Sequence, residues 1–200
     1  MRCLPFITLL GQLSLQENQP EQAKKYFRKA VDINPRLTIG YRSLARIHMT
    51  DNRPDSAEKV ILEGLAVVPD DTVLTMTLAS IYEKKLEFEK AISLYETLLD
   101  KNPDILIAKN NLASLLTDHR TDEASLSKAR NLASEFKNSK IPYFRDTYAW
   151  ASLNAGASVE ESVVILEDIV KESEKTAVFN YHLGMAYLKQ GNKGEASQYL

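Results

Sequence analysis

The sequence has 200 residues and a formal net charge of −2, which is enough chain for one globular domain or one repeat array. The balanced charge gives no footprint for nucleic acid or an anionic membrane, and the single Cys3 excludes a disulfide within the chain. The longest apolar run, residues 4–10, is far shorter than the ~20 residues of a membrane span. A signal peptide is the weaker interpretation, because no small-residue cleavage site is apparent.

Residues recur along the chain with a step of 34. Leucines recur at one position, small residues follow them directly, and alanines and prolines recur further on. The recurring residues are Leu10, Leu44, Leu78 and Leu112; Gly11, Ala45, Ala79 and Ala113; Ala23, Ala57 and Ala91; and Pro35, Pro69 and Pro103. The chain has only 7 prolines, so this spacing is not expected by chance. A fixed period of this length predicts a stacked repeat protein.

Taken in order, the first three repeats each predict a pair of helices. The first pair lies between residues 4 and 35 and turns at 18–20, where Pro20 suits the first turn of a helix. The second pair turns at 51–54 and ends at Pro69. In the third, apolar residues of 71–84 and 87–102 recur at helical spacing, and Pro103 ends the second helix because a proline restricts the residue before it.

In the fourth repeat the period slips. Leu116 is 13 residues from the next small packing residue, Ala129, whereas Tyr82 is 9 residues from Ala91. Four residues are therefore inserted around 118–128. An extra helical turn of ~3.6 residues would absorb them, and so would a longer loop. The second helix of this repeat is expected over 125–139.

The fifth repeat is the most irregular, and the sixth returns to the pattern. Ser162 replaces the usual alanine, whereas Leu183 and Gly184 match the earlier repeats. We expect a single array of about six repeats over residues 4–37, 38–71, 72–105, 106–141, 142–175 and 176–200. Solenoid ends normally carry a polar cap, and neither end shows one, so we expect a fragment of a longer array.

The recurring pattern resembles the tetratricopeptide repeat (TPR) family. A bulky residue is followed by leucine with a small residue, often tyrosine, then alanine, an aromatic or aliphatic residue, and proline. The first repeat shows it as Ile7, Leu10, Gly11, Ala23, Phe27, Ala30 and Pro35, and the second as Tyr41, Leu44, Ala45, Ala57, Ile61, Gly64 and Pro69. The resemblance implies an all-α, right-handed α-solenoid of antiparallel helix pairs.

The last two repeats also resemble the final repeats of large bacterial TPR proteins, some of which accompany exopolysaccharide export at the envelope. The matching residues are Asp146, Thr147, Trp150, His182, Leu183 and Gly184. This resemblance leaves the compartment open between cytoplasm and periplasm.

No catalytic, metal-binding or cofactor-binding motif stands out. The three histidines, His48, His119 and His182, form no pair at metal-ligand spacing, and there is no CxxC, HExxH, glycine-rich nucleotide loop or GxSxG. Carboxylate pairs at 70–71 and 160–161 lie near helix N-termini, where they favour the helix dipole. His48 replaces a tyrosine and is expected to be a half-buried packing residue. We therefore expect no enzyme, no cofactor and no metal.

The resemblance implies a concave groove lined by the first helix of each repeat. Residues there that do not face the partner helix are the expected binding residues: Arg42, Arg46, Met76, Ser80, Asn110, Asn111, Ser114, Asp146, Trp150, Tyr181 and Met185. The same register adds Thr8, Gln12, Ser43, Met49, Thr77, Thr147 and His182. The Hsp90-type carboxylate clamp of some TPR proteins is disfavoured, because Thr8, Gln12 and Thr77 do not match it.

Three features of this set carry alternatives. Arg42 and Arg46 are one turn apart and could clamp a carboxylate, or they could be solvated arginines paired with neighbouring acids. Two asparagines, at 110 and 111, could hold a peptide backbone, as groove asparagines do in related TPR proteins, or could be polar surface. Trp150 with Tyr181 and Met185 could form an apolar binding pocket, or could be core between repeats.

We therefore expect a non-catalytic interaction module that binds a peptide or helix in its groove. The expected partner is a protein segment, with no nucleic acid and no membrane insertion. One alternative is the substrate-recruiting arm of a larger enzyme, such as a glycosyltransferase. Another is a structural scaffold that self-associates through its uncapped ends.

Overall fold

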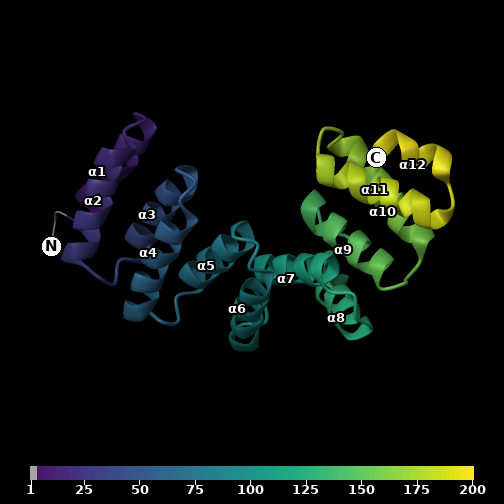
Figure 1. The fold of residues 1–200 in the computed structure, drawn as a ribbon, viewed down its shortest axis with the longest axis horizontal. Coiled ribbons are helices and arrows are strands. Elements are labelled where there is room, and N and C mark those ends of the chain that lie inside the picture. Colours follow the sequence, from purple (N-terminus) through teal and green to yellow (C-terminus); the bar gives the residue numbers. More distant parts are fainter. Residues whose placement is uncertain (1–3) are drawn as a thin grey trace. The chain divides into compact units, whose positions relative to one another are not determined.

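The structure is a computed structural model that describes residues 4–200, so Cys3 lies outside the described residues (Figure 1). The described chain forms twelve α-helices and one short 3-10 helix, with no strand, which confirms the all-α prediction. The helices are α1 (Leu4–Gln16), α2 (Pro20–Ile33), α3 (Thr38–Thr50), α4 (Pro54–Val67), α5 (Thr72–Lys84), α6 (Phe88–Lys101), α7 (Leu106–His119), α8 (Glu123–Ala133), η1 (Ser134–Phe136), α9 (Pro142–Asn154), α10 (Val159–Glu172), α11 (Ala177–Gln190) and α12 (Lys193–Tyr199).

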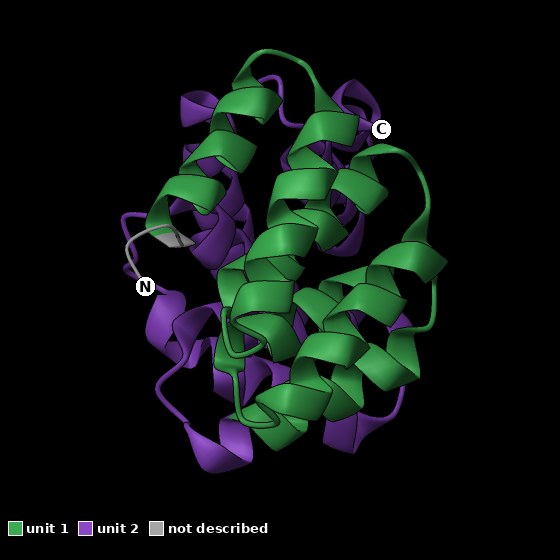
Figure 2. Cartoon of the chain, turned by 90° about the vertical axis from the view of Figure 1, so that its left-hand side faces the viewer, with its two compact units in different colours: residues 1–98 green, residues 99–200 purple. Residues whose placement is uncertain are grey.

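The helices are organised in two compact units, residues 1–98 and 99–200 (Figure 2). In the first unit, α2 packs on α1 and α3, and α4 packs on α3 and α5. In the second, α7 packs on α8 and α9, and α10 packs on α9 and α11. Within each unit these helices therefore lie against their neighbours in sequence, in rows of helix pairs. The repeat boundaries and the handedness expected from the sequence stay predictions.

The recurring small residues lie where two helices touch. Ala23, Ala57 and Ala91 in the second helices are 0% exposed, as are Ala45 and Ala79 in the first. A methyl group added at Gly11 would lie 2.8 Å from the Phe27 ring, which is closer than two non-bonded carbon atoms approach each other. Small residues at these positions thus set the spacing of the paired helices.

Most pairs turn at a residue in the left-handed conformation, a regularity that the sequence analysis did not identify. In the first unit these residues are Asn18, Asn52 and Leu86, with φ of 57°, 54° and 61°, and they are again 34 residues apart. In the second unit Gly156 and Gly191 take this place, with φ of 74° and 87°. In each turn the next N–H donates to a carbonyl five residues back, at 2.8–2.9 Å, which ends the helix as a Schellman motif.

The insertion in the fourth repeat forms extra helix rather than a long loop. The second helices begin three residues before the packing alanine in the regular pairs, as Phe88 does before Ala91, but α8 begins at Glu123, six residues before Ala129. The helix α8 therefore starts about one turn early. It also ends early, at Ala133, and continues as η1. The turn before it lacks the left-handed residue, because the cap residue Arg120 is extended.

The core of the second unit accommodates the unusual Ser162. This side chain is 1% exposed, and its hydroxyl donates to the Ala149 carbonyl at 3.1 Å and to the Ser158 carbonyl at 3.2 Å. A buried hydroxyl that finds acceptors avoids most of the penalty for burying a polar group. Serine can therefore stand where the other repeats have alanine.

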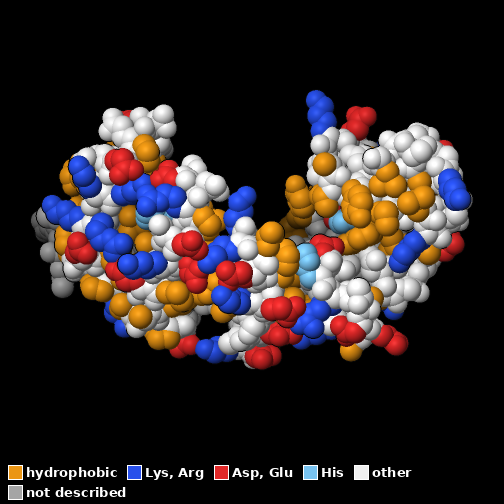
Figure 3. Space-filling model, in the orientation of Figure 1, with side chains coloured by type: hydrophobic (Ala, Val, Ile, Leu, Met, Phe, Trp, Pro, Cys, Tyr) orange, Lys and Arg blue, Asp and Glu red, His pale blue; other side chains and the backbone are white. Residues whose placement is uncertain are grey.

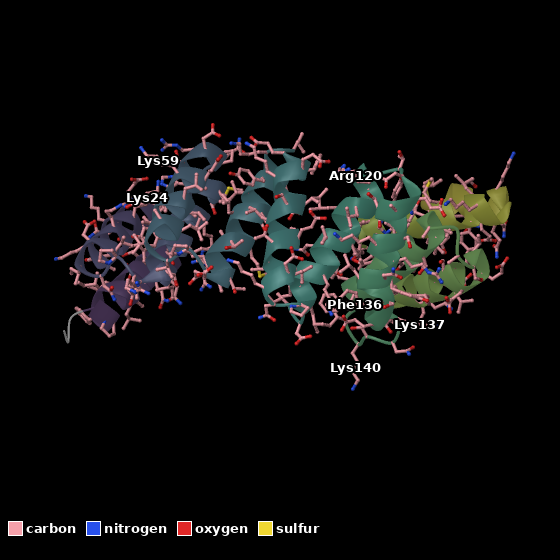
Figure 4. The ribbon with its side chains drawn as sticks, turned by 90° about the horizontal axis from the view of Figure 1, so that it is seen from below. Lys24, Lys59, Arg120, Phe136, Lys137 and Lys140 are labelled. Atoms are coloured by element: carbon pink, nitrogen blue, oxygen red, sulfur yellow. The ribbon has the colours of Figure 1, made fainter. Side chains whose placement is uncertain are left out.

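An ion pair recurs between successive helix pairs of the first unit with its charges exchanged. Lys24 of α2, which is labelled in Figure 4, donates to Asp51 at the end of α3 at 2.7 Å. One period later, Glu58 of α4 accepts from Lys85 at the end of α5 at 2.5 Å. The positions are equivalent, but the base lies on the second helix in one case and on the first helix in the other.

No described helix is both long and apolar enough to cross a membrane.

Candidate functional site

The second unit exposes a stripe of apolar side chains along α11. Val178, Tyr181, Met185 and Leu188 are three or four residues apart, so they share one face of the helix. Tyr181 is 48% exposed, and Val178 and Leu188 are each 41% exposed, whereas Met185 is half-buried. In Figure 3, hydrophobic side chains gather over α11. We call the stripe, together with Trp150 of α9, the aromatic face.

Trp150 is fixed in this face by contacts from two other helices. Its ring stacks on the His182 ring of α11, with centroids 4.2 Å apart and planes 10° apart. Its Nε1 donates to the Asp118 carboxylate of α7 at 2.7 Å. The Tyr181 ring lies beside it, with centroids 6.1 Å apart and planes tilted by 59°. The indole is thus held in one orientation while the neighbouring tyrosine remains exposed.

A buried acid and histidine lie behind the tryptophan. The carboxylate of Asp146 on α9 contacts Nδ1 of His182 at 2.9 and 3.0 Å, and the two residues are only 5% and 7% exposed. Burial raises the pKa of Asp146, and the hydrogen bond to His182 opposes that rise. The sequence register placed both side chains in the groove, but they join α9 to α11 instead, because each is the polar partner that the other needs.

The α7 side of this surface is polar. Ser114 lies 3.3 Å from the Thr147 hydroxyl of α9, and Thr147 itself is buried. The Asn110 amide donates to the Asn111 side-chain oxygen at 3.3 Å. The Asn110 Oδ1 atom is buried, with no hydrogen-bond partner among the residues that the structure describes. The two asparagines and Ser114 are all half-buried.

The remaining predicted binding residues lie in the first unit. Arg42 and Arg46 of α3 are both exposed and one turn apart. Neither forms an ion pair within the part of the chain that the structure describes. Met76 of α5 is half-buried and Ser80 is exposed. Neither arginine is therefore paired with an acid among the described residues, and their role in binding stays a prediction.

Sequence reasoning missed Asp118 as part of the tryptophan site. Asp118 lies four residues after Ser114 on α7, so the helical register alone places it on the same face. His48 is half-buried as expected, and burial lowers its pKa, with Lys24 and Arg53 adding to the effect. Across residues 4–200, no three His, Cys, Asp or Glu side chains are grouped so that they could hold a metal ion.

Comparison with protein families matches three segments of the chain. Residues 14–81, 77–106 and 177–200 each match a model described as a tetratricopeptide repeat. No curated protein gives a significant match to the sequence. The matched segments lie in both compact units, and they include α11 of the aromatic face.

Solved structures share the fold at low sequence identity. A tetratricopeptide repeat protein from Parabacteroides merdae has a TM-score of 0.77 and 18% identity, covering 100% of this chain and 78% of that chain. PilW, a type IV pilus biogenesis factor, has a TM-score of 0.76 and 14% identity, covering 100% and 91%.

YrrB, a TPR protein with an unusual peptide-binding site, has a TM-score of 0.65 and 16% identity, covering 86% of this chain and 88% of that chain. At such identities the likeness concerns the fold alone, an α-helical repeat solenoid. The further resemblance to envelope-associated proteins is not confirmed by these matches.

Proposed function

This chain belongs to the tetratricopeptide repeat family, and from that premise we propose that it is an interaction module whose aromatic face binds a segment of a partner protein. The observation that carries the proposal is the exposed apolar stripe on α11 beside the fixed Trp150. Apolar side chains that gather on a folded surface mark interaction sites more often than scattered ones do. Partners of protein or peptide nature are what this fold supports.

The chemistry of the face suits an apolar side chain flanked by backbone. Tyr181 and Trp150 offer large ring surfaces at small conformational cost, because the indole is already held by His182 and Asp118. Aromatic side chains of this kind are enriched among the few residues that carry most of the binding energy in interfaces. The half-buried Asn110 of the neighbouring α7 would offer its side-chain amide to the backbone of the bound segment.

The arginine pair of the first unit adds a second contact of different chemistry. Arg42 and Arg46 share one face of α3, and neither is engaged by an acid within the described residues. Guanidinium groups bind carboxylates with two parallel hydrogen bonds. This pair would therefore recognise an acidic residue of a partner.

One relative supports this use of the fold. YrrB, whose fold this chain shares, is a TPR protein with an unusual peptide-binding site. The likeness concerns the fold, so the binding residues proposed for this chain depend on its own α7, α9 and α11.

Peptide selection tests the proposal. A random peptide library is selected on the wild-type protein and counter-selected on a Tyr181→Asp/Met185→Asp variant. Recovered peptides are expected to carry aromatic or large aliphatic residues and to bind the wild type at least tenfold more tightly than the variant. Such a loss is about 1.4 kcal/mol, within the range for removing interface aromatics.

Val164→Asp is the matched control, because Val164 of α10 is 64% exposed but lies outside the aromatic face. It should leave peptide binding unchanged. Peptides that bind all three proteins equally would show that the aromatic face is not the site, and a selection that enriches no peptide would contradict the proposed function.

Arg46→Glu should leave the circular dichroism spectrum unchanged, since that side chain is exposed.

A further inference from the structure

We propose that the corner between Trp150, Tyr181 and Asp118 takes a cationic side chain, an arginine or lysine of the bound segment. The inference rests on the proposed function, because it names which residue of the segment the aromatic face selects. Its three parts come from three helices, α9, α11 and α7, so the corner exists only when the unit is folded.

The Trp150 and Tyr181 rings are inclined to each other, and the tyrosine side chain is exposed to solvent. Their centroids are 6.1 Å apart and their planes are inclined by 59°, and the tyrosine is 48% exposed. A cation is attracted to an aromatic ring when it lies within about 6 Å of the ring centre. Two inclined rings at this spacing can therefore contact one charged group together.

The hydrogen bond of Trp150 to Asp118 strengthens the attraction of the indole ring for a cation. Nε1 of Trp150 donates to the carboxylate of Asp118 at 2.7 Å. A negative partner at the N–H increases the electron density of the indole, and tryptophan is already the best of the aromatic residues for binding cations. The same hydrogen bond fixes the carboxylate at the edge of the corner.

The charge around the corner is negative. Asp118 is exposed and forms no ion pair with any residue that the structure describes. Behind it, Asp146 is engaged by His182. Lys189, the lysine of α11, is directed elsewhere, because its Nζ donates to the Leu153 carbonyl at 2.9 Å. A cation entering the corner therefore meets a carboxylate that has a hydrogen bond from Trp150 but no counter-charge among the described residues.

Apolar side chains suit the stripe along α11, but a neutral side chain would not complete the corner beside Asp118. An apolar group could contact Trp150 and Tyr181, but it would leave the Asp118 charge beside an apolar surface without a counter-charge, which is unfavourable. An anion would be repelled by the same carboxylate. A guanidinium or ammonium group satisfies both the rings and the acid, and its alkyl stem can lie along the apolar stripe of α11.

Trp150 is the single tryptophan of the chain, so its fluorescence reports on the corner directly. The wild-type protein is titrated with choline and with 3,3-dimethylbutan-1-ol, which has the same shape without the charge, at constant ionic strength. We expect choline to change the fluorescence with saturation and the neutral alcohol to bind roughly three- to thirtyfold more weakly. Equal binding of the two probes, or no response to choline, would overturn the proposal.

Two variants and one control locate the binding. Asp118→Asn removes the charge and keeps the shape, and Tyr181→Leu removes a ring from an exposed position. Both should weaken choline binding by roughly three- to thirtyfold, and circular dichroism should show an unchanged fold. Asp104→Asn, at an exposed carboxylate before α7, should have no effect. Choline binding that survives Asp118→Asn at full strength would also overturn the proposal.

The selected peptides separate this inference from the function on which it rests. Peptides that depend on the aromatic face and are enriched in arginine or lysine support both. Peptides that depend on the face but carry no basic residue overturn the cationic corner and leave the proposed function standing. If no peptide depends on the face, the proposed function itself fails.

Discussion

At the scale of single residues, the repeats differ in which residue occupies the left-handed position of the turn between the two helices. Asn18 and Asn52 suit a positive φ, because asparagine tolerates this conformation better than most residues. Leu86 occupies the equivalent position with φ of 61° and is 72% exposed. Leucine therefore carries backbone strain there without gaining burial in return.

Leu86→Asn is expected to stabilise the protein by about 1 kcal/mol, because it removes the cost of a branched side chain at positive φ. Urea unfolding measures the change. The reverse substitution, Asn52→Leu, should destabilise the protein by a similar amount. If both variants unfold at the wild-type midpoint, the left-handed turns are not a source of strain.

The buried polar pair shows where residue-level prediction from sequence stops. The helical register correctly finds Trp150 and Tyr181 near each other. It cannot tell that Asp146 and His182 turn inward, because that depends on their contact across two helices that are far apart in sequence. Periodicity places a residue on a face of its own helix, whereas burial also depends on the helix opposite.

At the scale of helices, the fully buried alanines predict a steric effect. Ala91→Leu should destabilise the protein by about 1–3 kcal/mol, because Ala91 is 0% exposed and the added atoms would push α6 away from its neighbours. Ala66→Leu, at an exposed position of α4, is the control and should have little effect. Thermal unfolding measures both, and equal melting temperatures would contradict the packing role of Ala91.

The ion pair between Lys24 of α2 and Asp51 at the end of α3 predicts that exchanging its two charges restores part of the stability. Lys24→Glu and Asp51→Lys should each lower the melting temperature, because each places like charges together. The double variant should recover the part of the loss that comes from position 51, whereas the like charges at positions 21 and 24 remain. Lys25→Glu, on the exposed side of α2, is the control for a simple change of net charge, and the idea fails if Lys24→Glu is no more damaging than this control.

At this same scale the sequence predicts helices well and irregularities poorly. Amphipathic periodicity and prolines define most helices of the first unit, including α5 and α6. For the fourth repeat the sequence predicts either an extra turn or a longer loop, because the period counts the inserted residues without placing them. The early start of α8 is set by its cap, since Asp122 accepts a hydrogen bond from the Ser125 N–H.

At the scale of the whole molecule, stability should change with pH through Glu161. Its carboxylate accepts hydrogen bonds from Lys137 at 2.5 Å and from Tyr148 at 2.9 Å, and these lower its pKa from the ordinary value of a glutamate. A lowered pKa in the folded state adds stability above pH about 4.5, and this is lost as the pH falls through the folded-state pKa. Wild type should therefore melt at a higher temperature than Glu161→Gln at pH 7, and the two should converge as the pH falls below the folded-state pKa of Glu161.

Asp146 acts with the opposite sign, because burial raises its pKa. Its contribution is present at pH values below its unfolded pKa and lost as the pH rises through the folded one. Asp146 is present in both the wild type and Glu161→Gln, so the difference between their melting temperatures at each pH comes from Glu161. A difference that stays constant from pH 7 to pH 3 would contradict the assignment.

The family and the helical solenoid fold could be inferred from the sequence because they depend on a pattern that repeats. Leu78 and Ala79, for example, have counterparts 34 residues away in the neighbouring repeats, so the same helix pair is predicted several times over. A binding site is formed by residues that do not repeat, such as Trp150 and Asp118, which occur once each in this arrangement. The position of such residues relative to one another follows only from the structure. The peptide selection described above identifies the ligand.

The exchanged ion pairs affect how such a chain can change length in evolution. Unequal recombination deletes or duplicates whole repeats. Losing α3 and α4 would bring Lys24 against Lys85, and duplicating them would bring Glu58 against a second Asp51. Both events place like charges in contact, which is unfavourable. The alternating charges thus favour the present order and number of repeats in the first unit over its nearest genetic rearrangements.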